Sequence, residues 1–77
     1  MDYTVTDFES LRKLCIKHKW FTAGSNEQYD KLFDANESGL PIEAIAAMIY
    51  VCSDGWWYGD ILEILYAERT RYALVNS

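Results

Sequence analysis

The stretch that most constrains the fold is residues 41–53, which starts with the single proline of the chain and is apolar on nearly every side. Only Glu43 and Tyr50 offer a polar edge at helical spacing. A helix that is apolar almost all round is typical of the buried centre of a domain. Its apolar run at residues 44–52 is too short to span a bilayer. We therefore predict a buried central helix with two apolar faces, the first made of Ile42, Ile45, Ala46, Ile49 and Cys52, and the second of Ala44, Ala47, Met48 and Val51.

Two helices are predicted before the central one, each from a start signal followed by apolar residues three and four positions apart. The first begins at a capping box in which the Thr6 hydroxyl accepts from the Glu9 amide, and the second begins at a capping box over residues 25–28. Gly39 stands where a glycine ends a helix, just before Pro41. The predicted core residues are Phe8, Leu11, Leu14, Cys15 and His18 on the first helix and Tyr29, Leu32 and Phe33 on the second.

A fourth helix is predicted after Asp60, which fits an N-cap with Glu63 three residues further on. Arg69 falls inside its apolar stripe, where we expect the side chain to reach the rim or to meet an acid. Residues 2–5 could form a short extended arm, although no partner strand is predicted. The expected fold class is all-α, a compact four-helix domain that covers residues 1–77. The core face of the last helix is predicted to contain Ile61, Leu62, Leu65 and Tyr72.

Composition and charge narrow the range of partners. The chain of 77 residues is 51% hydrophobic, which is enough for one core and too much for a disordered protein. Its net charge is −5. Residues 21–68 are acidic, with Lys31 as their single Lys or Arg, whereas both ends of the chain are weakly basic. This balance argues against nucleic acid or anionic lipid as a partner. The first 20 residues lack an apolar signal segment, so we expect a cytoplasmic protein without a membrane partner.

The two cysteines are the first candidates for chemistry. Cys15 and Cys52 each lie on a predicted core face, nothing indicates export, and unpaired cysteine is among the most buried residue types. Cys15 and His18 stand one turn apart, but a zinc site needs four ligands and the paired spacings are absent. No phosphate-binding glycine loop or nucleophile motif occurs. We therefore predict free buried thiols, no metal or other cofactor, and no enzymatic activity.

An acidic stripe is the first candidate for a partner contact. Its members are spaced three, four and three residues apart, so on a helix they fall within an arc of about 80°. Such a stripe is either a solvated face or a contact for a basic partner, where it could imitate a row of phosphates. The acidic stripe consists of Glu27, Asp30, Asp34 and Glu37.

An aromatic segment is the second candidate. Trp56, Trp57 and Tyr58 lie between Gly55 and Gly59, outside any periodic stripe. Trp and Tyr are the residues most enriched at interface hot spots. We expect one tryptophan to fill the core and the other to be partly exposed, and the segment could contact a partner or mediate self-association.

Residues 38–65 are similar to the first half of a helix-turn-helix, with Ile-Ala at positions 45–46 and a turn at residues 51–53. However, Tyr50 occupies the position that is usually the turn glycine, and residues 54–68 contain no Lys or Arg. A recognition helix reads bases mostly through Arg, Lys, Asn and Gln. A degenerate helix-turn-helix regulator is therefore the second alternative for the function.

The segments Leu-Phe-Asp-Ala-Asn at residues 32–36, Gly-Leu-Pro-Ile-Glu-Ala-Ile-Ala at 39–46 and Cys-Ser-Asp at 52–54 resemble small acidic proteins of unassigned function. Such proteins are carried on bacterial mobile elements, for example conjugative transposons and phages. The resemblance extends over residues 25–70 and implies a cytoplasmic bacterial protein that acts as a helper, regulator or inhibitor. It brings no catalytic residues.

Together these features favour a non-enzymatic interaction module, an accessory protein of a mobile element that acts on a protein partner or on itself. The first alternative is an acidic inhibitor that occupies a nucleic-acid-binding surface of a host defence protein.

Overall fold

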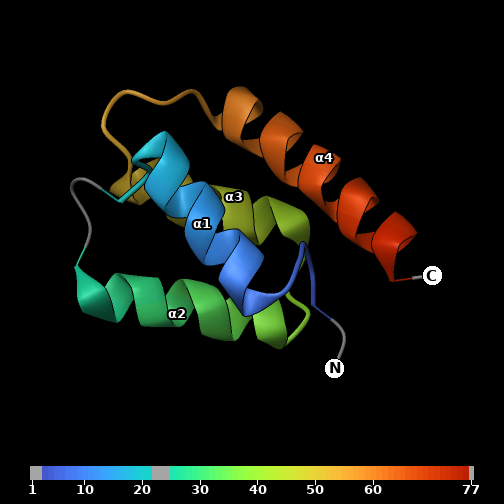
Figure 1. Ribbon diagram of the computed structural model, residues 1–77. Coiled ribbons are helices and arrows are strands. Elements are labelled where there is room, and N and C mark those ends of the chain that lie inside the picture. The colour runs from blue at the N-terminus through green and yellow to red at the C-terminus, as the bar shows by residue number, and fades with distance from the viewer. Residues whose placement is uncertain (1–2, 22–24, 77) are drawn as a thin grey trace.

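The computed structural model describes residues 3–21 and 25–76, and its regular structure over these residues is entirely helical. Figure 1 shows α3 in the middle of the fold, with α2 on one side, α4 on the other and α1 crossing in front. α3 packs against α2 and α4, and α1 packs against α2. The predicted all-α fold is confirmed. The helices are α1 (Phe8–His18), α2 (Asn26–Glu37), α3 (Ile42–Cys52) and α4 (Tyr58–Val75).

The inner face of α3 is buried as predicted, since its five residues are each at most 4% exposed. The prediction of a second buried face is wrong. Ala47 is exposed and Val51 is 72% exposed, whereas Ala44 and Met48 are half-buried. The neighbouring helices do not surround α3 completely, so part of a helix that is apolar all round meets solvent.

The faces of α1 and α2 agree with the prediction except at one residue. Leu11, Cys15 and Leu32 are buried in the core. Phe8 is 46% exposed and packs at the edge, where its ring lies 4.5 Å from that of Phe33, centroid to centroid. The half-buried members of the two faces are Leu14, His18, Tyr29 and Phe33.

The start of α1 differs from the predicted capping box. The carboxylate of Asp7, not the hydroxyl of Thr6, caps the helix, and it accepts from the Ser10 N–H at 2.8 Å. Thr6 is fully buried, and its carbonyl accepts from the Asn36 side chain. A tertiary contact therefore holds Thr6 in the core and leaves its neighbour to cap the helix.

Asn36 of α2 holds the N-terminal arm in place. Its Oδ1 accepts from the Val5 N–H at 2.9 Å, and its Nδ2 donates to the Thr6 carbonyl at 2.8 Å. Its own carbonyl accepts from the Thr4 N–H at 2.9 Å. Because Asn36 is only 1% exposed, these bonds are shielded from water. The described part of the predicted arm is therefore held by one buried amide, and no strand occurs within the described residues.

Both predicted end signals of α2 are confirmed. The Ser25 N–H donates to the Gln28 side chain at 2.7 Å, and the Gln28 N–H donates back to Ser25 Oγ at 3.3 Å. At the other end Gly39 has a φ of 79°, and the Leu40 N–H donates to the Ala35 carbonyl at 3.1 Å. This is the Schellman arrangement, in which a left-handed glycine ends the helix.

α4 begins two residues before the predicted N-cap. Trp57 is the N-cap and makes no side-chain cap bond, while Asp60 lies in the first turn, where its charge favours the helix dipole. Ile61 and Leu65 are buried as predicted. Arg69 is exposed and lies over an aromatic ring, with its Cζ 4.7 Å from the centroid of Tyr66. The half-buried members of the predicted core face are Leu62 and Tyr72.

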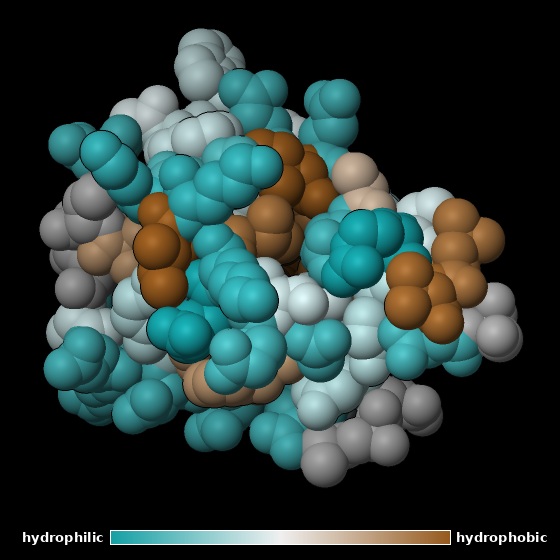
Figure 2. Space-filling view, viewed as in Figure 1, coloured by the Kyte–Doolittle hydropathy of each residue, from teal (hydrophilic) through white to brown (hydrophobic). Residues whose placement is uncertain are grey.

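Over residues 3–21 and 25–76, each helix is too short or too polar to cross a bilayer. Figure 2 shows a largely hydrophilic face on which apolar side chains form separate spots and not one continuous patch. The side turned to the viewer is the one that α1 crosses in Figure 1.

Candidate partner-binding site

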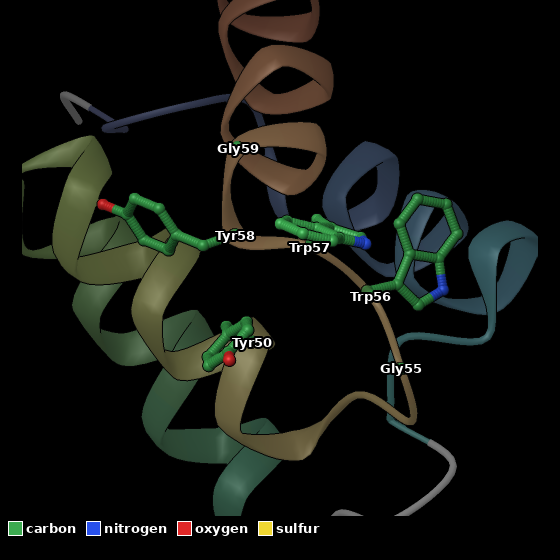
Figure 3. Close-up of a pocket in the computed structure, with 6 residues that line it drawn as sticks. All are labelled: Tyr50, Gly55, Trp56, Trp57, Tyr58 and Gly59. Atoms are coloured by element: carbon green, nitrogen blue, oxygen red, sulfur yellow. The ribbon is translucent and has the colours of Figure 1, made fainter.

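A hollow of about 390 Å³ opens at the corner between α3 and α4. Figure 3 shows the side chains of Tyr50, Trp57 and Tyr58 around this space, with the connecting loop closing its remaining side. The rings of Tyr50 and Tyr58 meet edge to face, with centroids 6.3 Å apart. We call this site the aromatic hollow; its lining residues are Tyr50, Gly55, Trp56, Trp57, Tyr58 and Gly59.

The loop at residues 53–57 shapes the hollow. The N–H and the hydroxyl of Ser53 both donate to the Tyr50 carbonyl, at 3.3 Å and 3.0 Å, which ends α3. Gly55 has a φ of 85°, in the left-handed region that only glycine adopts at no steric cost. The loop therefore turns sharply at Gly55 and carries two tryptophans into α4.

The two adjacent tryptophans have different environments. Trp56 is half-buried, and its ring meets those of Trp20 and His18 edge to face, at 5.8 Å and 5.4 Å between centroids. Trp20, beyond the end of α1, is fully buried, whereas Trp57 is 79% exposed. In Figure 3 Trp56 points toward α1 and Trp57 lies beside the hollow. This matches the expectation of one packed and one exposed tryptophan, except that Trp56 packs against the core and not inside it.

Glu43 of α3 anchors two tyrosines of α4. The Tyr58 hydroxyl donates to the Glu43 carbonyl at 3.3 Å, and the Tyr66 hydroxyl donates to the Glu43 carboxylate at 3.2 Å. Burial and, after it, this bond to the carboxylate raise the pKa of Tyr66 above its usual 10. Tyr58 is thus held against α3, so one wall of the hollow is fixed before any ligand arrives.

Gly59 forms part of the wall without a structural reason to be glycine. It lies in the first turn of α4, where glycine in a helix costs about 0.5–1 kcal/mol relative to alanine. A Cβ added at this position would meet nothing within 4 Å. Its backbone also lies outside the positive-φ region, in contrast to Gly55.

The surroundings of the aromatic hollow are acidic. Residues 32–68 contain no Lys or Arg. Asp54 and Asp60 are exposed and stand next to the lining segment in the sequence, one on either side. This part of the chain therefore contributes negative charge and no positive charge to the region around the hollow.

The acidic stripe lies apart in sequence, on α2. All four carboxylates are on exposed residues. Glu27 lies 3.7 Å from the Nζ of Lys31, and within residues 3–21 and 25–76 the other three acids form no ion pair. The stripe is thus a solvated, negatively charged surface; its members are Glu27, Asp30, Asp34 and Glu37.

The two cysteines are unsuited to nucleophilic chemistry, and the environment of the histidine favours its neutral form. Cys15 and Cys52 are buried free thiols, as predicted. Burial raises the pKa of Cys15 to about 12 and that of Cys52 above its usual 9, so both stay protonated at neutral pH. Burial and then the charge of Lys17 lower the pKa of His18, which keeps the imidazole neutral. In the part of the chain that the structure describes, no three His, Cys, Asp or Glu side chains gather into a metal-binding group.

Besides Gly55, which sets the turn, two lining residues of the hollow were not among the predicted contacts. Tyr50 carried a usable signal, since it is one of two polar interruptions in an otherwise apolar helix. Gly59 carried a weaker one, because a glycine beside a predicted helix start is common in turns. The structure brings both together with the predicted aromatic segment, and it leaves the acidic stripe on a different helix.

No protein-family model, curated protein or solved structure matches the chain. The aromatic hollow and the acidic stripe are therefore interpreted from their own geometry and charge.

Proposed function

We propose that the chain is a non-enzymatic interaction module that binds a protein partner through the aromatic hollow. The observation that carries this proposal is the 79% exposure of Trp57 on a corner whose other aromatic rings are packed or anchored. An indole supplies one of the largest apolar areas that a contact can bury, on the order of 200 Å². Trp and Tyr are also the residues most enriched at contact hot spots.

The fixed geometry of the hollow supports the same function. Tyr58 is bonded to α3, Trp56 is held by the buried Trp20, and Gly55 sets the turn between them. Side chains that are ordered before binding lose little conformational entropy on association. A preformed aromatic surface is therefore favourable for a contact of modest size.

We place this module in the bacterial cytoplasm, as an accessory protein of a mobile element. The resemblance of residues 25–70 to small acidic proteins of such elements supports this assignment. The two buried unpaired thiols fit a reducing compartment, where structural disulfides are rare.

The test is affinity capture from a bacterial lysate on three immobilised proteins: wild type, Trp57→Ala and Val51→Ala. Val51 is the matched control, because it is exposed to a similar extent on α3 and does not line the hollow. Quantitative mass spectrometry should find at least one protein that wild type and Val51→Ala retain and Trp57→Ala loses. Equal retention of every captured protein by all three would exclude the hollow as the contact.

The acidic stripe favours a second candidate, an acidic inhibitor that covers a nucleic-acid-binding surface of a host defence protein. Its exposed carboxylates on one helix face can attract a basic surface over distances of about 8 Å at physiological ionic strength. Reversing Asp30 and Asp34 to Lys should then slow association and weaken its dependence on salt. A partner that binds this double variant at the wild-type rate would exclude the stripe.

A further inference from the structure

We propose that the aromatic hollow binds the guanidinium group of an arginine in a basic segment of the partner protein. This inference rests on the proposed function and specifies the chemistry that the hollow recognises. Its first support is the arrangement of Tyr50, Trp57 and Tyr58, whose rings surround the open space in Figure 3. Aromatic faces carry negative electrostatic potential and attract a cation placed over them, Trp most strongly.

The charge around the hollow is the second support. Asp54 and Asp60 are exposed on either side of the lining segment, and residues 32–68 contribute no positive charge. The lining itself contains no ionised side chain, so a cation in the hollow would contact the rings and meet no positive charge from residues 32–68. A neutral or acidic segment would gain nothing from these carboxylates.

The chain itself contains the same contact on the neighbouring surface of α4. The guanidinium carbon of Arg69 lies 4.7 Å from the centroid of the Tyr66 ring. Arginine is favoured over lysine at such a site because its planar group stacks on rings and presents several donors to nearby carboxylates. The wide, open form of the hollow, at about 390 Å³, suits a flat group better than a point charge.

Gly59 is the third support. Neither its backbone nor its packing requires glycine, and it lines the hollow. Its presence is explained if a ligand occupies that space. Replacement of Gly59 by Lys would put a cation of the chain's own in the hollow, at an exposed helix position that tolerates lysine.

The experiment compares three synthetic peptides with the sequence Gly-Ser-X-Gly-X-Gly-Ser, in which X is arginine, lysine or citrulline, the neutral isostere of arginine. Binding is followed through the NMR signal of the Trp57 indole N–H in wild type, Trp57→Ala serving to assign that signal. We expect the arginine peptide to bind about tenfold more tightly than the citrulline peptide, because tenfold corresponds to about 1.4 kcal/mol, which lies within the range of a cation–π contact. The lysine peptide should fall between them.

Two variants test the location. Gly59→Lys should weaken binding of the arginine peptide about tenfold or more, since it fills the hollow with like charge. Asn76→Lys is the control, because it adds the same charge at the opposite end of α4 and should change the affinity less than about twofold at physiological ionic strength. Circular dichroism should show both variants to be folded.

Equal binding of the arginine and citrulline peptides would overturn this inference, as would equal binding by wild type and Gly59→Lys. Tighter binding of the lysine peptide would overturn the assignment of a guanidinium. A Trp57 signal that shifts with protein concentration alone would identify a second copy of the chain as the occupant. These outcomes leave the capture of a Trp57-dependent partner unaffected, whereas absence of such a partner would count against the proposed function even if the arginine peptide bound.

Discussion

The two corners at the ends of α3 share a left-handed glycine but differ in whether the neighbouring side chain is buried. Each turns on a glycine in the left-handed region, with φ of 79° at Gly39 and 85° at Gly55. At the first corner the neighbouring Asn36 is 1% exposed and binds the N-terminal arm. At the second corner Trp57 is 79% exposed and has no covering segment among the described residues. We call them the closed corner, at residues 36–41, and the open corner, at residues 53–59.

The closed corner shows that a chain of this length can cover the residues at a turn. The length of the chain therefore does not explain why Trp57 is exposed at the open corner. At the closed corner, three backbone groups of residues 4–6 bond to the side chain or the backbone carbonyl of Asn36, which is itself buried. The open corner contains larger apolar side chains that could be buried, and one of them, Trp57, still lies in solvent. This exposure supports the proposed contact surface, because an aromatic side chain that a partner is to cover must stay free of the chain itself.

The largest expected effect lies in the helix that joins the two corners. Ile49 is fully buried on the inner face of α3, and Ile49→Ala should lower the free energy of unfolding by about 2–5 kcal/mol through lost transfer energy and a cavity. Urea denaturation followed by circular dichroism measures it. Val51→Ala, on the exposed side of the same helix, is the control and should cost less than about 0.5 kcal/mol. A loss below 1 kcal/mol for Ile49→Ala would contradict the buried inner face.

The next effect sharpens the comparison at the closed corner. Asn36→Ala removes the acceptor of the Val5 N–H and the donor to the Thr6 carbonyl. Each buried group left without a partner costs about 1–3 kcal/mol, so we expect a loss of about 2–4 kcal/mol in urea denaturation. Asn26→Ala, on the exposed first position of α2, is the control. Similar values for the two variants would show that the arm does not depend on Asn36.

The two corners also differ in how much the sequence could predict. Apolar spacing predicted the inner face of α3, and the glycine and proline order predicted where α2 ends. The same spacing could not show that Val51 faces solvent, because an all-round apolar helix gives no sign of how many neighbours it has. Nor could it choose Asp7 over Thr6 as the cap of α1, because the choice depends on Asn36, 30 residues away from Thr6 along the chain.

The candidate site was predicted only in part, because some of its contacts also depend on tertiary packing. Its aromatic segment was visible as three large residues between two glycines. Tyr50 was assigned to a helix edge, and only the packing of α4 against α3 brings it to Tyr58. The burial of Trp20 also depends on tertiary structure, since it follows α1 at a position with no periodic signal.

A smaller effect is expected from an ion pair on α4. The Glu68 side chain is 11% exposed and accepts from Arg71 at 2.9 Å and 2.6 Å. The bond from Arg71 lowers the pKa of Glu68, and this outweighs burial, which raises it. A pKa lowered by folding stabilises the fold above the usual value of 4.5, and the contribution is lost as the pH falls below it. Glu68→Gln should therefore cost about 0.5–1 kcal/mol at pH 7, because Arg71 is half exposed and water screens the pair.

The measurement is urea denaturation of wild type and Glu68→Gln at pH 7 and pH 3. The difference between the two proteins should be smaller at pH 3 than at pH 7, because the contribution of the ionised carboxylate is lost as the pH falls through the lowered pKa of Glu68. Glu63→Gln, on an exposed position of α4, is the control and should show no comparable pH dependence. An equal difference at both pH values would assign the effect of Glu68→Gln to packing instead of charge.

The smallest expected effect on stability is at Trp57. It decides whether the open corner stabilises the fold or serves as a contact surface. Trp57→Ala should change the free energy of unfolding by less than about 0.5 kcal/mol, since the side chain is 79% exposed. Trp20→Ala, which truncates a fully buried ring of the same type, should cost about 3–5 kcal/mol in the same urea denaturation. If Trp57→Ala destabilised the protein as much as Asn36→Ala, the open corner would be a structural corner like the closed one, and its exposed indole would no longer indicate a partner. A stable Trp57→Ala variant that has lost its partner would instead separate binding from folding at a single side chain.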